Sequence, residues 1–424
     1  MCGGFFTITT RTDGRSVGFM RSDSCACGAQ TGNTLAGRKF GGCSLPEAFC
    51  TLMASRALLV GTAVGLLLVG VWMGVDRRGP DAPPKDPGAA ASGLGHDGSP
   101  KGPVFDVQSV TLDARTRPDS SLLVRLRDLG VTHLTLVAFG WQERASSTEI
   151  GVDTTAGWYS ESHVGIRTLS RQAHALGMEV ILKPHLWVGG YDEAQNRSEI
   201  GFESADRWQK WEAEYRRFLM MYARLAAEVA ADVLVLGTEL TRAATERPDF
   251  WRGLAADVRA VYDGDLTYAA NWHKAYRQVP FWDALDYVGV QAYFPLTDAE
   301  SPSSAALRDG WASHWDDLAA VHERTGRPIL FTEVGYRSAP GAAKAPWTWP
   351  ERDGAAAPND ALQARCYQAF LSTFAQAPWM KGSIIWKWHP PAEVERRTGF
   401  TPQGKPAEAV LRRWFRSPPS ERGS

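Results

Sequence analysis

From residue 104 onward, short apolar runs alternate with longer segments in which apolar residues recur at helical spacing. Apolar runs of roughly four to eight residues are typical of strands, and apolar residues every three to four positions indicate amphipathic helices. Eight segments fit the strand pattern: Phe105 to Val110, His133 to Phe139, Glu179 to Lys183, Val233 to Gly237, Leu266 to Ala270, Tyr287 to Ala292, Ile329 to Thr332 and Ser383 to Trp386. Helical patterns between them include Ser121 to Leu129, Val164 to Leu176, Ala205 to Val229, Phe250 to Tyr262 and Asn359 to Phe374.

This alternation predicts an α/β fold with a parallel sheet. Runs such as VLVLG at 233–237 and YVGVQA at 287–292 are apolar on both faces, as in strands that helices cover on both sides. Eight such units predict a (β/α)8 barrel, the TIM barrel, over residues 104–416, since these barrels have about 250 residues or more. The alternative is an open doubly wound sheet, which would normally begin with a Gly-rich turn that this sequence does not offer.

The residues before 104 carry a different pattern. Residues 57–75 form a stretch of 19 residues without a charged side chain, close to the roughly 20 that span a bilayer core. We expect a transmembrane signal anchor here, because the short positive segment Met53-Ala54-Ser55-Arg56 precedes it. Residues 1–52 lack periodicity and are interpreted as a disordered leader or as the product of a start placed upstream of Met53. Residues 76–103 are rich in Pro, Gly and Ala, which is typical of a flexible linker.

Net charge, cysteine positions and residue spacings limit the classes of partner and cofactor that the chain is expected to bind. The net charge of -1, from 46 basic and 47 acidic residues, lacks the positive excess of proteins that bind nucleic acid. Five of the six cysteines lie within the first 50 residues, so we expect a barrel built without disulfides. The His and Cys spacings fit no metal motif, and no Gly-rich phosphate loop joins a strand to a helix. We therefore expect no metal and no cofactor.

Two glutamates stand at the ends of predicted strands. Glu239 follows the fourth strand and Glu333 follows the seventh. Reacting groups in barrels of this kind come from the C-terminal ends of strands. Glycosidic cleavage needs two carboxyl groups, one that protonates the leaving oxygen and one that stays ionised, and retaining enzymes hold them about 5 to 5.5 Å apart. A single strand-end glutamate would more often form a rim ion pair, but the pair on these two strands predicts a retaining glycoside hydrolase.

Further motifs follow the predicted strands in a fixed order. They are Lys183-Pro184-His185, Leu236-Gly237-Thr238-Glu239-Leu240, Leu266-Thr267-Tyr268-Ala269-Ala270-Asn271-Trp272, Phe281-Trp282-Asp283 through Ala292-Tyr293-Phe294-Pro295-Leu296, Phe331-Thr332-Glu333-Val334-Gly335-Tyr336 and Trp386-Lys387-Trp388. Together they resemble glycoside hydrolase family 113, in the clan of retaining barrels with the acid/base after strand four and the nucleophile after strand seven. Characterised members of that family are endo-β-1,4-mannanases, and the resemblance covers roughly residues 104–390.

The resemblance implies a role for each matching residue. Glu239 would be the acid/base and Glu333 the nucleophile, while Tyr293 would lie beside Glu333 and keep it ionised and oriented. Trp386 would form the platform under the sugar at the cleavage point. Many relatives in the clan have Asn directly before the acid/base, where it holds the 2-hydroxyl group of the sugar, whereas this chain has Thr238. The mechanism is therefore better defined than the sugar.

Other polar and aromatic residues at strand ends are candidates for substrate contacts. Lys183 and His185 after strand three, and Asn271 and Trp272 after strand five, could bind sugar hydroxyls or form structural hydrogen bonds. Since the chain has 17 tryptophans, we also expect some in loops to stack on sugar rings. The loop candidates are Trp141, Trp187, Trp347 and Trp349. His314 and His389 are expected to be structural.

The sequence thus predicts a retaining, endo-acting hydrolase of a β-linked polysaccharide, with mannan or glucomannan first. One alternative keeps the two glutamates and changes the substrate to β-glucan or another cell-surface glycan. Another is a catalytically inactive, membrane-tethered barrel that only binds glycans. Because the polymer lies outside the cell, we expect an extracytoplasmic catalytic domain, anchored by residues 57–75 or secreted if that segment is cleaved.

Overall fold

The structure is a computed structural model that describes residues 104–416 except for 156, 190–195, 349–356 and 395–396. Its strands are β1 (Val107–Leu112), β2 (His133–Gln142), β3 (Gly151–Val152), β4 (Glu179–Val188), β5 (Val233–Thr238), β6 (Asp265–Asn271), β7 (Tyr287–Gln291), β8 (Ile329–Val334) and β9 (Met380–Trp388). Its α-helices are α1 (Ser121–Leu129), α2 (His163–Ala175), α3 (Ala205–Glu228), α4 (Thr241–Glu246), α5 (Pro248–Arg259), α6 (Ala275–Gln278), α7 (Ser304–Thr325), α8 (Asp360–Phe374) and α9 (Pro406–Phe415). Short 3-10 helices are η1 (Tyr159–Glu161), η2 (Arg197–Glu199), η3 (Trp282–Ala284) and η4 (Pro391–Glu393).

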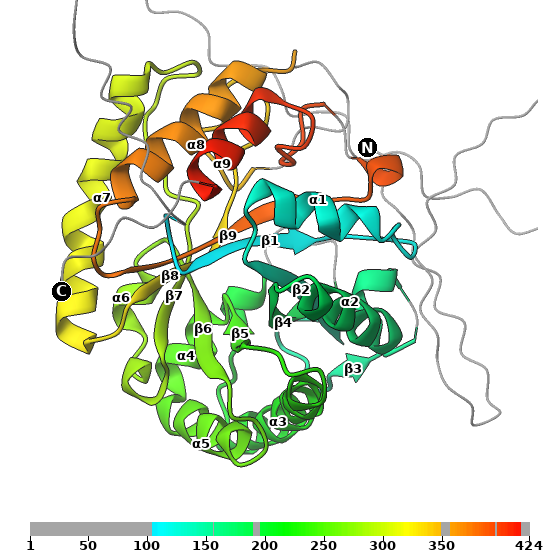
Figure 1. The fold of residues 1–424 in the computed structure, drawn as a ribbon. Coiled ribbons are helices and arrows are strands. Elements are labelled where there is room, and N and C mark those ends of the chain that lie inside the picture. The colour runs from blue at the N-terminus through cyan, green and yellow to red at the C-terminus, as the bar shows by residue number, and fades with distance from the viewer. Residues whose placement is uncertain (1–103, 156, 190–195, 349–356, 395–396, 417–424) are drawn as a thin grey trace, which may run out of the picture. The chain divides into compact units, whose positions relative to one another are not determined.

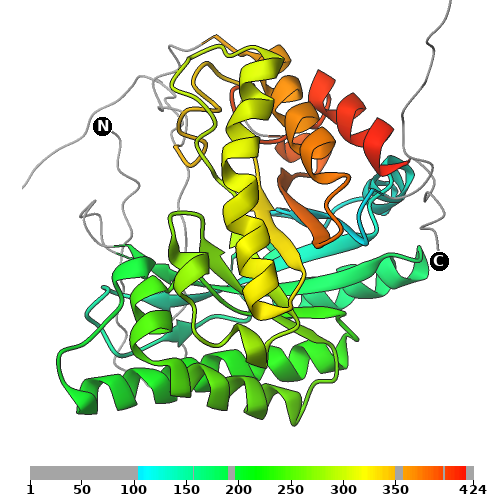
Figure 2. The same cartoon turned by 90° about the vertical axis from the view of Figure 1, so that its left-hand side faces the viewer.

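Eight parallel strands close into a ring in the order β1, β2, β4, β5, β6, β7, β8, β9. The ring is closed because β1 pairs in parallel with both β2 and β9. Strand β3 is a two-residue antiparallel addition to β2 outside the ring. Figure 1 shows the helices surrounding these strands, and Figure 2 shows α7 lying across them. The predicted (β/α)8 barrel is confirmed, and the open sheet is excluded.

The predicted strands are all present, with shifted ends. Strand β1 begins and ends two residues later than expected, and β2, β4 and β9 are longer. Strands β2 and β4 pair over ten consecutive residues, which extends both toward the C-terminal mouth of the barrel. Lys183 and His185 therefore lie inside β4, and Glu333 lies inside β8, rather than after the strands as the sequence suggested.

Apolar side chains form two separate layers. Large residues such as Trp211, Trp251 and Trp311 fill the space between the strands and the helices. A smaller cluster fills the barrel interior, and its members are Val107, Ile181, Val233, Val235, Ala269, Tyr287, Leu330 and Ile384. Since side chains alternate along a strand, the inward row that starts at Ile181 continues with Lys183 and His185. The apolar plug thus ends below a set of polar side chains at the mouth.

The predicted leader, signal anchor and linker, residues 1–103, lie outside the described residues. Within the described part, no helix is both long and apolar enough to cross a membrane. Cys366 in α8 is a buried free thiol.

Candidate active site

Glu333 lies at the mouth of the barrel in a cage of polar side chains. Its Oε1 accepts a hydrogen bond from Lys183 Nζ at 2.5 Å, and its Oε2 accepts one from Tyr293 Oη at 2.7 Å. Burial raises the pKa of Glu333, but the charge of Lys183 and the hydrogen bonds from Lys183 and Tyr293 lower it more, to below its usual value. The Glu333 carboxyl group is therefore ionised at neutral pH.

Lys183 is fully buried and bound by three oxygens. Besides Glu333, its ammonium group donates to Gln291 Oε1 at 3.1 Å and to the Thr332 carbonyl at 2.9 Å. Thr332 Oγ1 donates to the same Gln291 oxygen at 3.0 Å. Burial lowers the pKa of Lys183, and the negative charge of Glu333 opposes this. Lys183 thus holds and neutralises Glu333, and it has no exposed surface with which to contact a sugar.

His185, Tyr293 and Trp386 complete the surroundings of Glu333. His185 Nε2 lies 3.8 Å from Glu333 Oε1, and its ring is nearly parallel to that of Trp386. Burial, and then the positive charges of Lys183 and Arg197, place the pKa of His185 well below its usual value, so the ring is neutral. Burial and the charge of Glu333 raise the pKa of Tyr293, so its hydroxyl remains a donor. These predicted site residues are thus brought together.

Glu239 lies directly after β5 and has its own set of partners. Arg197 of η2 contacts its Oε2, with both Nε and Nη2 at 3.1 Å, and Asn271 Nδ2 donates to its Oε1 at 3.4 Å. The backbone of Glu239 has a φ of 57°, which is in the left-handed region that residues other than glycine rarely adopt. Such strained conformations cluster at functional sites. The charge of Glu239 also acts on the pKa of Lys183 and of Tyr293, so both glutamates share one electrostatic environment.

The two strands that position the glutamates, β5 before Glu239 and β8 around Glu333, both have an irregular register near the glutamate. The pairing of β5 with β6 shifts between Val235 and Thr238, and the pairing of β7 with β8 shifts between Val290 and Gln291, which faces Glu333. In the inward row of β8, Leu330 is followed by Thr332, so strict alternation would turn Glu333 outward. Register shifts of this kind re-aim side chains next to active sites. Glu333 faces Lys183 because β8 departs from regular pairing.

The other predicted residues lie around this centre. Thr238 is buried at the end of β5, and its Oγ1 has no hydrogen-bond partner among the described residues. Trp272, next to Asn271, stacks on Trp347 with ring centroids 4.9 Å apart. Trp141 stacks on Trp187 at 6.2 Å. Trp187 and Trp347 are each more than 40% exposed, at 43% and 44%, so both offer indole surface to a ligand.

The sequence also pointed to Trp349, His314 and His389. Trp349 lies outside the described residues. His314 packs against Phe294, and its Nε2 lies 3.0 Å from the Pro295 carbonyl oxygen, which is a structural contact as expected. His389 Nδ1 lies 3.1 Å from the Asp113 carbonyl oxygen.

Two residues of the site were missed in the sequence. Gln291 ends β7, two positions before Tyr293. Because side chains alternate along a strand, Gln291 shares the inward face of β7 with Tyr287, and this spacing could have identified it as a site residue. Arg197 lies in a loop segment after β4 with no strand or motif around it. No local signal in the sequence identifies it, because Arg197 and Glu239 are 42 positions apart and meet only in the tertiary structure.

Comparison with known proteins identifies the family of this chain. The model of Glycoside Hydrolase Family 113 matches residues 107–405. The chain belongs to glycoside hydrolase family 113. It is accordingly a glycoside hydrolase, and the family resemblance seen in its motifs is confirmed. No functionally curated protein matches the chain in sequence.

Solved structures of family 113 cover nearly all of the barrel. A complex of a family 113 β-1,4-mannanase is 26% identical with a TM-score of 0.62, and the match covers 74% of this chain and 99% of that one. The family 113 β-mannanase AaManA from Alicyclobacillus acidocaldarius, in complex with ManMIm, is 28% identical with a TM-score of 0.62, over 73% and 97% of the two chains. A family 5 mannosidase from Rhizomucor miehei shares the fold at 10% identity and a TM-score of 0.51, over 74% and 93%.

Proposed function

We propose that this family 113 hydrolase cleaves internal β-1,4 linkages of mannan or glucomannan with retention of configuration. Glu333 acts as the nucleophile and Glu239 as the acid/base. The observation that carries the proposal is the ionised Glu333 carboxylate, held by Lys183 and Tyr293 at the same barrel mouth as Glu239. A carboxylate fixed in this way can attack without first losing a proton.

In the first step, a Glu333 oxygen attacks the anomeric carbon of the sugar above Trp386. The bond from that carbon to the glycosidic oxygen breaks, and Glu239 gives its proton to the departing oxygen. The products are a covalent ester between Glu333 and the sugar, and the released aglycone part of the chain. Glu333 loses its negative charge when it forms the ester. Glu239 becomes a negatively charged carboxylate when it gives up its proton.

In the second step, the Glu239 carboxylate takes a proton from a water molecule as the water attacks the same carbon. The ester bond breaks, and Glu333 leaves as a carboxylate that Lys183 and Tyr293 again stabilise. Two inversions give net retention. Arg197 beside Glu239 stabilises the carboxylate form that this step begins with.

Three observations support a neutral β-mannan as the substrate. The similar family 113 structures are those of β-mannanases. The rim carries the exposed rings of Trp187 and Trp347, which suit stacking on sugar rings. Asn271, beside Glu239, is partly exposed, so its amide can hydrogen-bond the hydroxyls of the sugar at the cleavage point, whereas the predicted contact of Thr238 would require its buried hydroxyl to become accessible. We place Trp272 and Trp386 in the same substrate-binding set.

The substrate is tested on the full chain with mannan, glucomannan, cellulose, β-glucan and peptidoglycan fragments. We expect the protein to cleave only mannan or glucomannan. If it prefers another of these polymers, the proposed substrate is wrong, but the proposed mechanism still holds. If the wild type turns over none of them and glycan binding survives in both Glu239→Ala and Glu333→Ala, the protein is a binding barrel and the proposal is wrong.

The roles of the two glutamates are separated by azide rescue with an activated aryl β-mannobioside. In Glu239→Ala, azide should attack the ester intermediate and give a β-glycosyl azide. In Glu333→Ala, azide should attack the substrate directly and give an α-glycosyl azide. The same anomer from both variants, or no rescue in either, would contradict the assignment. Glu179→Ala, at the other end of the barrel, is the matched control and should need no rescue.

We also propose that residues 57–75 anchor the protein in a membrane with the catalytic domain outside the cytoplasm. The support is the uncharged stretch of 19 residues and the extracellular location of the polymer. Protease added to intact cells should degrade the barrel but not a cytoplasmic control. A barrel that is protected until the cells are lysed would reverse the orientation.

A further inference from the structure

Gln291 is a buried polar residue of the mouth that no step of the proposed mechanism uses. It ends β7, its side chain is only 1% exposed, and its pairing partner in β8 is Glu333. With so little exposed surface, Gln291 cannot contact a sugar. Any effect of Gln291 on the reaction must therefore pass through the side chains that it contacts.

The irregular pairing of β7 with β8 brings two consecutive residues of β8 to Gln291. Gln291 pairs with Glu333, whereas the preceding pair is Val290 with Phe331. Thr332 is therefore an extra residue on β8. An extra residue of this kind interrupts the alternation of side chains and re-aims them. Thr332 Oγ1 accordingly donates to Gln291 Oε1 at 3.0 Å, although the next residue, Glu333, also faces Gln291.

The contact with Lys183 fixes the orientation of the Gln291 amide. Lys183 Nζ lies 3.1 Å from Gln291 Oε1, and an ammonium group only donates hydrogen bonds. The amide atom that faces Lys183 must therefore be the oxygen. The amide nitrogen is then left to donate to Glu333, and this hydrogen bond lowers the pKa of the Glu333 carboxyl group. Gln291 thus accepts from the cation and donates to the anion of one ion pair.

Lys183 depends on this acceptor because its side chain is completely buried. Its three N–H groups serve Gln291 Oε1, the Thr332 carbonyl and Glu333 Oε1. Without Gln291, one N–H group of a buried cation would lose its acceptor. Burial favours neutral groups, and transfer of one proton from Lys183 Nζ to Glu333 Oε1 would leave an amine and a carboxylic acid. A protonated Glu333 cannot attack the anomeric carbon.

We propose that Gln291 is a positioning residue that bridges the Lys183 cation and the Glu333 anion and so keeps both of them charged. Its oxygen keeps the proton on Nζ of the cation, and its nitrogen stabilises the carboxylate. Thr332 Oγ1 holds the amide in this orientation. This inference rests on the proposed function, because it takes Glu333 as the nucleophile.

The test replaces Gln291 in the full chain, with an aryl β-mannobioside as the substrate. Gln291→Met keeps a similar length and volume and removes both the acceptor and the donor of the amide. The acidic limb of kcat/KM should move to higher pH by about one unit, the scale of losing one hydrogen bond to a charged group. At the optimal pH, kcat should fall about tenfold, while KM stays within about twofold of the wild type because Gln291 touches no sugar.

A second variant removes only the group that orients the amide. Thr332→Val takes away the hydroxyl group that donates to Gln291 and keeps the backbone carbonyl that accepts from Lys183. The acidic limb should move in the same direction by a smaller amount. This variant keeps the test valid if Gln291→Met folds poorly. An acidic limb that stays at the wild-type pH in the folded variants would overturn the inference.

Gln108 provides a matched control at the opposite end of the barrel. It is also a buried glutamine of a barrel strand, and its Nε2 donates to the Gly130 and Phe415 carbonyl oxygens at 2.7 and 3.0 Å. Gln108→Met should lower stability and leave the acidic limb, kcat and KM at their wild-type values. If the limb moves as far in Gln108→Met as in Gln291→Met, the shift reports a general loosening of the barrel and the inference is wrong.

Four other titratable groups lie around Glu333 at the mouth. They are Lys183 and His185 of β4, Tyr293 after β7 and Glu239 after β5. None of these four is replaced in the variants. A moved acidic limb therefore reports the loss of the bridge and not the loss of another charged group.

A direct measurement of the proton on Glu333 separates this inference from the proposed function. The carbonyl stretch of protonated Glu333 is the infrared band that is lost in Glu333→Gln. On acidification it should appear at a pH about one unit higher in Gln291→Met than in the wild type. If it appears at the same pH in both, the inference is wrong, whatever the turnover. If it shifts but Glu333→Gln keeps full activity, the bridge is present and the proposed function fails.

Discussion

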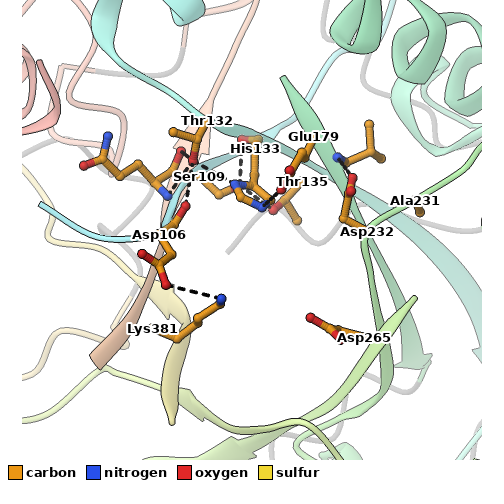
Figure 3. Close-up of polar contacts among 12 residues, drawn as sticks. Asp106, Ser109, Thr132, His133, Thr135, Glu179, Ala231, Asp232, Asp265 and Lys381 are labelled. Atoms are coloured by element: carbon orange, nitrogen blue, oxygen red, sulfur yellow. Dashed lines mark hydrogen bonds and ion pairs between the residues drawn. The ribbon is translucent and has the colours of Figure 1, made fainter. Parts of the chain in front are cut away.

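The two ends of the barrel both carry charged clusters, but the clusters differ in burial. At the mouth, Lys183 and Glu333 form an ion pair with side chains 0% and 7% exposed. At the opposite end, shown in Figure 3, Lys381 pairs with Asp106 at 3.4 Å and His133 contacts Glu179 at 2.6 Å. Glu179 and Asp106 are more than half exposed there. Water therefore screens most of the charge at that end and little of it at the mouth.

Two carboxylates at the far end of the barrel accept hydrogen bonds from backbone N–H groups. Asp232, which is labelled in Figure 3, accepts a hydrogen bond at its Oδ2 from the Val180 N–H at 2.8 Å. Asp286 accepts one from the Leu266 N–H at 2.7 Å and pairs with Arg259. These contacts tie the start of one strand to the loop before its neighbour. The difference teaches that polar groups at the far end fix the strands, whereas those at the mouth keep a carboxylate charged where a ligand can reach it.

The largest expected contrast is between Glu333→Gln and Glu179→Gln. Glu333→Gln should lower kcat by on the order of 10⁴-fold or more, the scale of removing a member of a catalytic set. Glu179→Gln should leave kcat within about twofold of the wild type, because groups at the N-terminal face of barrels serve stability. Steady-state kinetics on glucomannan measure both. If kcat falls by a comparable factor in both variants, catalysis does not depend more on the mouth than on the far end of the barrel.

A second contrast concerns the two lysines. Lys183→Met leaves Glu333 buried without its cation, which should cost roughly 3 to 5 kcal/mol of unfolding free energy at pH 7. Lys381→Met breaks a half-exposed pair and should cost less than about 1 kcal/mol. Chemical denaturation measures both. If both variants lose a similar amount of unfolding free energy, burial does not make the Lys183 pair contribute more to stability than the Lys381 pair.

Lys183→Met should also change the pH dependence of turnover. Lys183 lowers the pKa of Glu333, so its removal raises that pKa. Glu333 must be ionised to attack, so the acidic limb of kcat/KM should move to higher pH. An acidic limb that stays in place would show that Lys183 does not set the charge of Glu333.

A third contrast is the pH at which each end loses stability. Burial, and then the charge of Lys381, lowers the pKa of His133 from 6.5 to about 4. The unfolded chain therefore binds a proton that the folded protein does not, and stability falls as the pH drops from 6.5 to about 4. His133→Gln should remove a loss on the order of 2 to 3 kcal/mol over that window. Thermal melts between pH 7 and 4 measure it.

The mouth should lose stability in a lower pH range. The pKa of Glu333 is below its usual 4.5, so the stability that its ionised form contributes is present above that value and is lost as the pH falls further. His133→Gln should therefore leave the decline below pH 4 in place. If that variant melts with the same pH dependence as the wild type from pH 6.5 to 4, His133 does not account for the acid sensitivity of the far end.

The smallest expected effect is that of Asp232→Ala. It removes the acceptor of the Val180 N–H, which should lower the free energy of unfolding by about 1 kcal/mol. Activity should persist, because Asp232 makes no contact at the mouth. Urea denaturation and kcat measured on the same preparation check both expectations. A large loss of kcat with unchanged stability would show that the far end influences the catalytic geometry.

The amino-acid sequence determined the barrel, its eight strands and the two glutamates. These features are local, because apolar spacing marks each strand and each glutamate stands at the end of one. Their order along the chain also carried the family resemblance. Glu239 and Glu333 were found because strands four and seven could be counted, without knowledge of any contact.

Only the tertiary structure decided which side chains act on those glutamates. Lys183 and Glu333 are 150 positions apart, and they meet because the ring closes and both face its interior. The register shift in β8 turns Glu333 inward against strict alternation, and Arg197 of η2 contacts Glu239 from 42 positions away. Asp113 and Lys387, 274 positions apart, likewise meet because β9 returns to pair with β1. Closure of the barrel brings together segments that are far apart in the sequence. The spacing of residues within one segment carries no information about such contacts.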